Sequence, residues 1–394
     1  MEKTKIAFFS EKAYTLFNPD YQFSFGGAEV DQYNLAIYLA KKPNIEVTFY
    51  VGDVGQAIEP EIVDGVRVQK IPMFGWQNKN LYKKVAHARH LFKILWGSDA
   101  DVVLTEAASD IVGWSAIFIK ILKKKHLIHR LASDRDTEYH KKLTSKRRRT
   151  YYLYRLGLKK ADLIISQTLQ QQRQLKTNMG FDSQVVTNGF FIDRDAEVGD
   201  KRHILWVGRC TALKQPELFV EMARRIPHKS FIMIMPPPTP VESEEFLQFA
   251  AALVEKASAL PNLTYIEHVP FNKIQQYYNQ AQLLVNTSKY EGFPNTFVQA
   301  CLGGTPIASL KVDPDGFITR NNLGFVGTND FNQLVQFVEN ISSQIISHLG
   351  ANALKYAKKY HDIRLMGSAY EEAINKLIKP DRADKMNMMK QVSV

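Results

Sequence analysis

Short runs of consecutive apolar residues alternate along the chain with longer segments in which apolar residues recur every three or four positions. Such runs are typical of strands buried on both faces, and the longer periodicity is typical of amphipathic helices. The runs predict strands at 5–10, 47–51, 66–71, 100–105, 125–131, 161–166 and 185–187, and again at 203–207, 230–235, 263–267, 283–285, 305–310 and 323–326.

Helical periodicity fills the intervals between these strands. It predicts helices at 30–41, 80–96, 111–125, 141–160, 169–179, 216–225, 244–259, 273–281, 297–302, 331–349 and 363–378. Strands that alternate with helices in this way form parallel sheets covered on both faces. Because the pattern restarts after a polar linker at 193–202, we expect an α/β protein with two Rossmann-like, doubly wound domains, at 1–192 and 203–362, facing across a cleft. The polar, Met-rich segment 380–394 is expected to form a flexible tail.

The charge of the chain adds a local feature to this picture. The 394 residues carry a formal net charge of +11, and the segment 123–160 alone has fourteen Lys or Arg against three acids, which also gives +11. A concentrated basic segment indicates a local anionic partner. An anionic membrane surface, a nucleic acid and plain solvation of a helix face are the three interpretations; no recognised nucleic-acid motif accompanies the segment.

The N-terminus and the two cysteines bear on the compartment. Only four apolar residues stand between the opening Met-Glu-Lys-Thr-Lys and Ser10, too few for a secretory signal, and no apolar stretch is long enough to span a bilayer. Cys210 and Cys301 lie far apart and in apolar surroundings, which favours buried free thiols. We therefore expect a cytoplasmic location.

Three segments carry candidate chemistry at predicted strand ends. The segment 288–306 contains Glu291 and leads from a strand into a helix N-terminus, an arrangement suited to anions and sugars. Arg209 and Lys214 follow another strand, where an Arg fork and a compact Lys charge can meet a pyrophosphate. The loop 25–29, Phe-Gly-Gly-Ala-Glu, follows the first strand; alone it is a weak signal that a tight turn explains equally well.

Together these segments resemble glycosyltransferase family 4, whose members have the GT-B fold of two Rossmann-like domains. GRCTALKQP at 208–216 resembles the family's diphosphate clamp, EGFPNTFVQACLGGTP at 291–306 its donor-sugar loop, and 25–29 its N-terminal glycine loop. The resemblance implies a retaining enzyme that moves a sugar from a nucleotide-diphosphate donor to a hydroxyl acceptor. It implies no further cofactor and makes a metal unnecessary, and it implies that the helix 363–378 packs back on the first domain.

The resemblance also assigns roles to residues of the donor site. Arg209 and Lys214 would hold the diphosphate, and Glu291 would bind a sugar hydroxyl or stabilise positive charge at the anomeric carbon. The donor-binding residues also include Gly27 and the helix start, where backbone N–H groups can face sugar or phosphate oxygens; that start comprises Phe293, Pro294, Asn295 and Thr296.

One position departs from the family pattern. The family places a second Glu eight residues after the first, and this chain has Gln299 there. A carboxylate can accept hydrogen bonds from both ribose hydroxyls, whereas Gln accepts only at its oxygen. We expect weaker or differently selective nucleotide binding but retained activity; a polar helix residue without a role is the alternative.

The catalytic position of the first domain is less defined. His129 ends a predicted strand and is the candidate for a His that faces the donor sugar in this family; His126, Ser133 and Asp134 compete with it, and a structural His is the alternative. Asp134 is also the candidate for acceptor binding. Asp134-Arg135-Asp136 and Asp313-Pro314-Asp315 match a metal-binding D-x-D pattern, but such short matches arise easily by chance.

Family members often act on lipid-linked acceptors, which favours the membrane interpretation of residues 123–160, with Arg147, Arg148 and Arg149 at its centre. The expected partners are a nucleotide sugar, a glycan or glycolipid acceptor and the inner face of a membrane. A GT-B epimerase or phosphorylase is a rival, although no pyridoxal-phosphate lysine motif stands out. A non-catalytic sugar-nucleotide sensor or membrane scaffold is the other rival, and Gln299 supports it.

Overall fold

The structure is a computed structural model that describes residues 3–21, 24–57, 59–71, 89, 92–138, 145–193, 199–238 and 243–379. The predicted tail and most of the predicted helix 80–96 lie outside these ranges. The chain divides into two compact units. Unit 1 comprises 1–11, 31–189 and 363–394, and unit 2 comprises 12–30 and 190–362.

The sheet of unit 1 has eight strands in the order β3-β4-β2-β1-β5-β6-β7-β8. All neighbours pair in parallel except β3 with β4. The strands are β1 (Thr4–Ser10), β2 (Ile45–Gly52), β3 (Glu61–Val63), β4 (Val66–Ile71), β5 (Val102–Glu106), β6 (His126–Arg130), β7 (Leu163–Ser166) and β8 (Gln184–Val185). Their apolar residues are buried, as a sheet covered on both faces requires.

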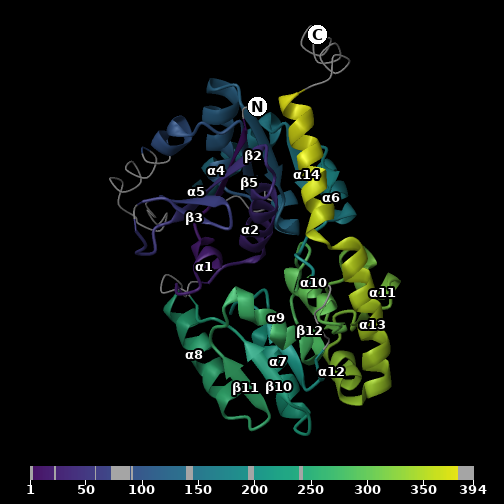
Figure 1. The fold of residues 1–394 in the computed structure, drawn as a ribbon. Coiled ribbons are helices and arrows are strands. Elements are labelled where there is room, and N and C mark those ends of the chain that lie inside the picture. Colours follow the sequence, from purple (N-terminus) through teal and green to yellow (C-terminus); the bar gives the residue numbers. More distant parts are fainter. Residues whose placement is uncertain are drawn as a thin grey trace. The chain divides into compact units, whose positions relative to one another are not determined.

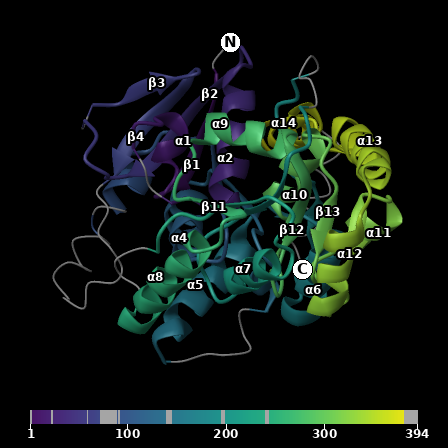
Figure 2. The same cartoon turned by 90° about the horizontal axis from the view of Figure 1, so that it is seen from below.

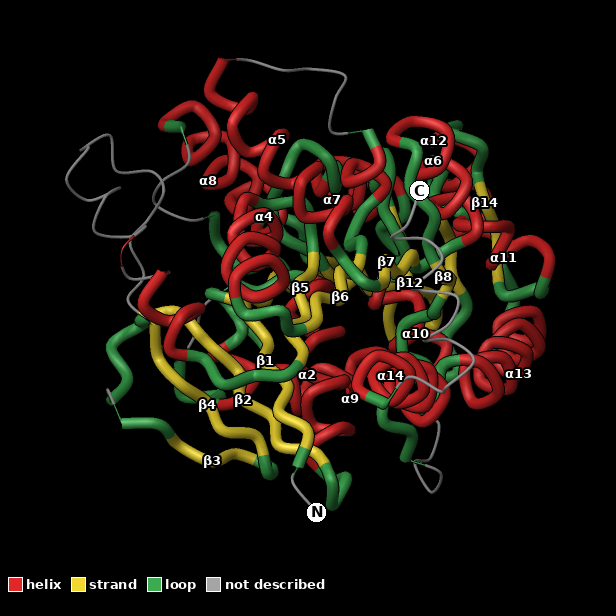
Figure 3. The backbone as a smooth tube through the Cα atoms, turned by 90° about the horizontal axis from the view of Figure 1, so that it is seen from above, coloured by secondary structure: helices red, strands yellow, loops and turns green. Residues whose placement is uncertain are grey.

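Helices cover both faces of this sheet, and Figure 3 shows α4 and α5 on one side of β5 and β6 and α2 on the other. The helices that unit 1 contributes or shares are α2 (Gly27–Ala40), α4 (Asp110–Ser115), η1 (Ala116–Leu122, a π-helix), η2 (Asp134–Thr137), α5 (Ser145–Lys160), α6 (Leu169–Met179) and α14 (Ile363–Ile378). Two glycines let α4 and α5 pack closely. A Cβ on Gly113 would lie 2.3 Å from the Leu153 carbonyl oxygen, and one on Gly157 would lie 2.5 Å from Val112 Cγ1.

The C-terminal helix α14, yellow in Figure 1, is counted with unit 1. The Tyr38 hydroxyl of α2 donates a 3.0 Å hydrogen bond to Glu371 of α14, and Lys42 forms an ion pair with the same carboxylate. The Gly189 N–H donates to Met366 Sδ at 3.2 Å. The last helix is therefore fixed to the first domain by polar contacts.

The sheet of unit 2 has six parallel strands in the order β11-β10-β9-β12-β13-β14. They are β9 (His203–Val207), β10 (Phe231–Ile234), β11 (Leu263–Ile266), β12 (Ala281–Asn286), β13 (Ile307–Ser309) and β14 (Gly324–Val326). The helices are α1 (Tyr14–Phe17), α7 (Pro216–Arg225), α8 (Glu244–Ser258), α9 (Phe271–Asn279), α10 (Asn295–Leu302), η3 (Pro314–Gly316), α11 (Phe317–Arg320), α12 (Phe331–Asn340) and α13 (Ser343–Tyr360).

The main core of unit 2 lies under α7, α8 and α12, where Phe219, Phe231 and Leu334 are completely buried. α10 packs against α9 and α13 instead. Figure 2 shows α7 and α8 beside β11, with α9 on the opposite side of that strand. The α/β class and the two Rossmann-like sheets predicted from the sequence are confirmed.

Three details differ from the predicted elements. β3 was not predicted, because its three residues lie at a sheet edge and its central Ile62 is 78% exposed. The predicted helix 331–349 is two helices, because Ser342 caps α13 by accepting a hydrogen bond from the Ile345 N–H. Residues 12–30 are grouped with unit 2, whereas the predicted first domain was continuous from residue 1.

Candidate functional site

An ion pair lies at the carboxyl edge of the unit 2 sheet. Lys214 Nζ contacts Glu291 Oε1, and Ser288 Oγ donates a 2.7 Å hydrogen bond to the same oxygen. Lys214 follows β9 and Glu291 follows β12, and these strands are neighbours. The side chains remain 21% and 14% exposed, so the pair is reachable from solvent. The sequence predicted both residues in one pocket but not that they pair.

Backbone and side-chain hydrogen bonds join the two loops that carry this pair. The Lys289 N–H donates to the Leu213 carbonyl at 2.9 Å. Thr287 Oγ1 donates to the Lys214 carbonyl at 2.6 Å and accepts from Trp206 Nε1 at 2.9 Å. Because both loops are fixed to each other beside buried Trp206, the cation and the carboxylate are held in a defined arrangement.

Arg209 lies beside the glycine loop, and the loop belongs to unit 2. A Cβ on Gly26 would lie 3.0 Å from Glu29 Oε2 and 3.8 Å from Arg209 Nη2. The Gly26 N–H donates to Glu29 Oε2 at 2.7 Å, so this helix-start donor already has a carboxylate acceptor. The absence of a side chain at Gly26 thus makes room for the Glu29 carboxylate and for the exposed Arg209 guanidinium.

The start of α10 is linked to the same loop through Asn295. Asn295 Nδ2 donates a 2.9 Å hydrogen bond to the carbonyl of Gly27, the first residue of α2. Asn295 is 8% exposed, so solvent screens this bond little. Pro294 is the N-cap of α10 and provides no side-chain cap. The structure therefore brings Gly27, Arg209, Lys214, Glu291 and Asn295 into one region of unit 2.

The remaining donor-loop candidates follow along α10. Thr296 is half-buried in the first turn, and Phe293 is buried against Phe317 and His361 in ring contacts of 5.0 and 5.2 Å. Gln299 is 7% exposed, and its backbone carbonyl accepts hydrogen bonds from Gln275 Nε2 and the Gly303 N–H. Through these two ring contacts, Phe293 fixes the loop that leads into α10.

His129 lies in the core of unit 1, not at a surface. It is completely buried; its Nδ1 is 3.0 Å from Thr105 Oγ1, and its ring contacts the Tyr154 ring edge-on at 5.5 Å. Burial lowers the pKa of His129 to about 3, so the ring is neutral near pH 7. This placement favours the structural role over contact with a sugar. His126, the competitor, is part-exposed at the start of β6, with Nδ1 3.6 Å from Asp162 Oδ2.

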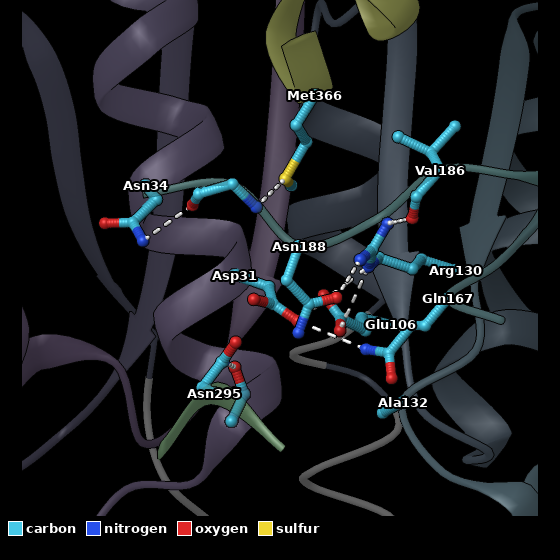
Figure 4. A network of polar contacts seen from close by, with 12 residues as sticks. Asp31, Asn34, Glu106, Arg130, Ala132, Gln167, Val186, Asn188, Asn295 and Met366 are labelled. Atoms are coloured by element: carbon cyan, nitrogen blue, oxygen red, sulfur yellow. Dashed lines mark hydrogen bonds and ion pairs between the residues drawn. The ribbon is translucent and has the colours of Figure 1, made fainter. Parts of the chain in front are cut away.

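The residue after His129 is the centre of a buried charge cluster, which the sequence analysis missed (Figure 4). Arg130 is 3% exposed; it donates to the Val186 carbonyl at 3.1 Å and to Asn188 Oδ1 at 2.6 Å. Its Nε lies 3.9 Å from Asp31 Oδ2 and 3.6 Å from Glu106 Oε1.

Burial opposes the charge of Arg130, but its neighbours reverse that effect. Tyr370 of α14, Asp31 and Glu106 together raise the pKa of Arg130 above its ordinary value. Gln167 Nε2 completes the cluster with a 3.2 Å hydrogen bond to Asp31 Oδ2. The signal for this cluster was a charged residue within an apolar strand, His-Leu-Ile-His-Arg-Leu at 126–131.

In each of the two D-x-D matches, one aspartate accepts hydrogen bonds from neighbouring groups of the fold. Asp136 accepts from the N–H groups of Ala132, Ser133 and Ala108, and burial raises the pKa of Asp136 to about 6. Asp313 accepts from the Ile318 N–H at 2.6 Å and from Thr319 Oγ1 at 2.7 Å. Asp134, the acceptor candidate, is half-buried at the start of η2, for which Ser133 is the N-cap.

Arg147, Arg148 and Arg149 of the basic segment lie near the start of α5. Arg148 and Arg149 are exposed, and the side chain of Arg147 lies outside the described part of the structure. Arg149 Nη2 lies 3.4 Å from Asp110 Oδ2. Burial raises the pKa of Asp110, and Arg149 partly offsets that effect. Part of the charge of this segment is therefore used within the fold.

Comparison with known proteins agrees with these features. The model of Glycosyltransferase Family 4 matches residues 25–194, and that of Glycosyl transferases group 1 matches residues 201–344. No curated protein matches the chain.

Among solved structures, sucrose-phosphate synthase from Thermosynechococcus elongatus is 17% identical with a TM-score of 0.75, over 96% of this chain and 100% of that one. WaaG, a glycosyltransferase involved in lipopolysaccharide biosynthesis, is 16% identical with a TM-score of 0.68, over 95% and 100%. TarM of S. aureus, solved with fondaparinux, alpha-GlcNAc-glycerol and UDP, is 11% identical with a TM-score of 0.70, over 94% and 99%.

The two Rossmann-like sheets and these similar structures show that the chain has the GT-B fold. In sequence, the two halves of the chain match two family models of this kind, Glycosyltransferase Family 4 in the first half and Glycosyl transferases group 1 in the second.

Proposed function

We propose that the protein is a retaining glycosyltransferase that moves a sugar, of hexose type, from a nucleotide-diphosphate donor to a hydroxyl acceptor without a metal ion. The observation that carries this proposal is the grouping of Arg209, Lys214, Glu291 and the glycine loop in unit 2. Two cations beside a carboxylate fit a diphosphate joined to a sugar, because the diphosphate needs positive charge and the sugar needs hydrogen-bond acceptors.

In this reaction the bond between the anomeric carbon and the diphosphate oxygen breaks, and the acceptor oxygen forms a new bond on the same face. The acceptor proton leaves with the diphosphate. Negative charge grows on the leaving diphosphate as this bond breaks, so Arg209 and Lys214 stabilise the transition state more than the bound donor. Glu291 faces the other partner, the anomeric carbon with its developing positive charge, or holds a donor-sugar hydroxyl.

The pairing of Lys214 with Glu291 adds a step to donor binding. In this structure the ammonium is neutralised by the carboxylate, so a diphosphate must share or replace that contact. Ser288 also donates a hydrogen bond to Glu291 Oε1, and this bond can hold the carboxylate once Lys214 turns toward phosphate. Binding of the donor is thus coupled to the freeing of a carboxylate oxygen for the sugar.

The acceptor is proposed to be a lipid-linked or cell-envelope glycan, reached from the cytoplasmic face of a membrane through residues 123–160. WaaG, one of the similar structures, takes part in lipopolysaccharide biosynthesis, and TarM was solved with a glycan and UDP. None of the helices in the described part of the chain has the length and apolarity to cross a bilayer.

Thermal shift with a panel of UDP-, GDP- and ADP-sugars tests the donor site, with Arg209→Ala as the variant. We expect one nucleotide series to raise the melting temperature of the wild type and Arg209→Ala to lose most of that shift. A shift that Arg209→Ala retains in full would contradict the diphosphate role.

A sugar-nucleotide sensor is the second candidate, and Gln299 favours it because a family carboxylate is missing. Turnover separates the two functions. Donor binding without sugar transfer or donor hydrolysis, tested with membrane extracts as acceptor, would support the sensor.

A further inference from the structure

An aromatic cluster lies open to solvent on unit 1, next to the basic segment but distinct from its arginines. Phe92 and Trp96, in the helical residues 92–97, stack with ring centroids 5.8 Å apart. Phe92 also contacts Phe118 of η1 edge-on at 4.9 Å, and Phe118 stacks on Trp114 of α4 at 5.8 Å. Four aromatic rings from two helical segments therefore form one continuous surface.

Four large apolar side chains on these segments face the solvent. Phe92 is 43% exposed, Trp96 51%, Ile121 45% and Leu122 53%. Leu95 and Ile119, on the same two segments, are completely buried in the core below. Each segment thus has one apolar side that packs in the core and another that stays exposed to solvent. A contiguous apolar surface exposed in this way indicates an interaction site.

Five lysines lie on or next to these segments, and contacts within the fold hold three of them. Lys123 Nζ donates to the Ser98 carbonyl, which joins the end of η1 to the end of helix 92–97. Lys120 pairs with Asp162, and Lys125 pairs with Asp101 at 2.6 Å. Lys93 and Lys124 are exposed, and among the described residues no ion pair involves either of them. From Lys120 to Lys125 the sequence KILKKK contains no acid.

We infer that this surface, formed by Phe92, Trp96, Ile121 and Leu122 with Lys93 and Lys124 beside them, inserts into the headgroup region of an anionic lipid bilayer. Trp prefers that region because its ring is apolar and its N–H is polar, and lysines beside it meet lipid phosphates. A second copy of the chain is a poorer occupant, because a symmetric contact would bring the two sets of lysines together.

This inference deepens the membrane part of the proposed function and moves the contact. Electrostatic attraction through Arg147–Arg149 alone would hold the protein above the headgroups, and salt would release it fully. Insertion of four apolar side chains adds a component that salt does not screen. The inference also says which side chains enter the bilayer. Trp96 inserts into the headgroup region, whereas Tyr152 of α5, although 65% exposed, is not required for binding.

The test is binding to vesicles of phosphatidylcholine with and without phosphatidylglycerol. The variant Trp96→Ser with Leu122→Ser removes the two most exposed groups of the surface, and both side chains are more than half exposed, so folding is spared. Ile62→Ser, at a 78% exposed position of β3, is the matched control. We expect wild type and control to bind the anionic vesicles and the double variant to bind about tenfold or more weakly.

Brominated lipids add a measure of depth. They should quench part of the wild-type tryptophan fluorescence, and Trp96→Phe should bind as well as wild type but lose that quenching. Undiminished binding of the double variant, or binding of the wild type without quenching, would overturn the inference. So would absence of binding by the wild type together with a dimer that the double variant abolishes, which would assign the surface to a second copy.

Donor binding, measured separately without lipid, keeps this result apart from the proposed function. If the wild type binds vesicles through Trp96 but no nucleotide sugar shifts its melting temperature, the transferase proposal fails and the surface stands. If donors shift the melting temperature but the double variant binds vesicles normally, the surface fails and the transferase proposal stands.

Discussion

Lys214 and Glu291 form an ion pair in which the carboxylate oxygen that Lys214 contacts also accepts a hydrogen bond from Ser288. The pair joins two loops at neighbouring strand ends, so that a change in either residue leaves the other partly buried without its partner.

Substitution of Lys214 by Ala should lower the rate of sugar transfer by about a hundredfold or more, because it removes a cation from the leaving diphosphate. Lys289→Ala is the control, since Lys289 is exposed on the neighbouring loop that carries Glu291 and has the same charge. Initial rates at saturating acceptor measure the effect. Equal losses in the two variants would show that only net charge matters.

The hydrogen bond from Asn295 to Gly27 should be necessary for an ordered glycine loop. Asn295→Ala is expected to raise KM for the donor several-fold while costing about 1 kcal/mol of stability. Asn321→Ala removes a similar 2.9 Å bond to a helix carbonyl, that of Phe317, in the same unit. The prediction fails if both variants lose stability and neither changes KM.

Replacement of Arg130 by Met should destabilise the protein by about 3–5 kcal/mol, because Asp31 and Glu106 then stay buried without their cation. Lys should rescue little, since a single ammonium cannot bond both the Val186 carbonyl and Asn188 in the same fork. Urea unfolding measures the loss, with exposed Arg155→Lys as control. Near-wild-type stability of Arg130→Met would show that the cluster contributes no net stability.

His129 should make the fold sensitive to mild acid. Its pKa is lowered by burial from 6.5 to about 3, so below pH 6.5 the unfolded chain binds a proton that the folded chain refuses. Stability should therefore fall as the pH falls from about 6.5 toward 3, by at most about 1.4 kcal/mol per pH unit from this group. His129→Gln should flatten this slope in urea titrations at several pH values; an unchanged slope would exclude His129 as its source.

Introduction of the family carboxylate by Gln299→Glu should strengthen nucleoside-diphosphate binding several-fold, because two acceptor oxygens can meet both ribose hydroxyls. Isothermal titration with UDP, GDP and ADP measures the change. Weaker binding by the Glu variant than by wild type would show that Gln299 suits the nucleotide of this protein.

The sequence predicted those elements that depend on local pattern. The buried strands and most helices appear near their predicted bounds, because continuous apolar runs and helical spacing are properties of single segments. β3 was not predicted, because an edge strand of three residues needs no continuous apolar run. The break between α12 and α13 depends on one capping serine within a periodic segment.

The candidate donor-site residues could be chosen from strand ends, but the ion pair between Lys214 and Glu291 could not be predicted. Lys214 and Glu291 are 77 positions apart in sequence, and only the adjacency of β9 and β12 brings them together. His129 was a reasonable candidate because it ends a strand. Successive side chains of a strand point to opposite faces of the sheet, and the sequence does not show that Tyr154 of α5 covers the face to which His129 points.

The glycine loop has a consequence for dissecting the enzyme. Residues 12–30 are part of unit 2 although nearly all of unit 1 separates them from residue 190. A fragment that begins at residue 190 therefore lacks the Gly27 carbonyl that Asn295 bonds. Unit 2, which carries the candidate donor site, is therefore not a continuous stretch of the gene, and exchanging it between relatives would require the loop to be exchanged with it.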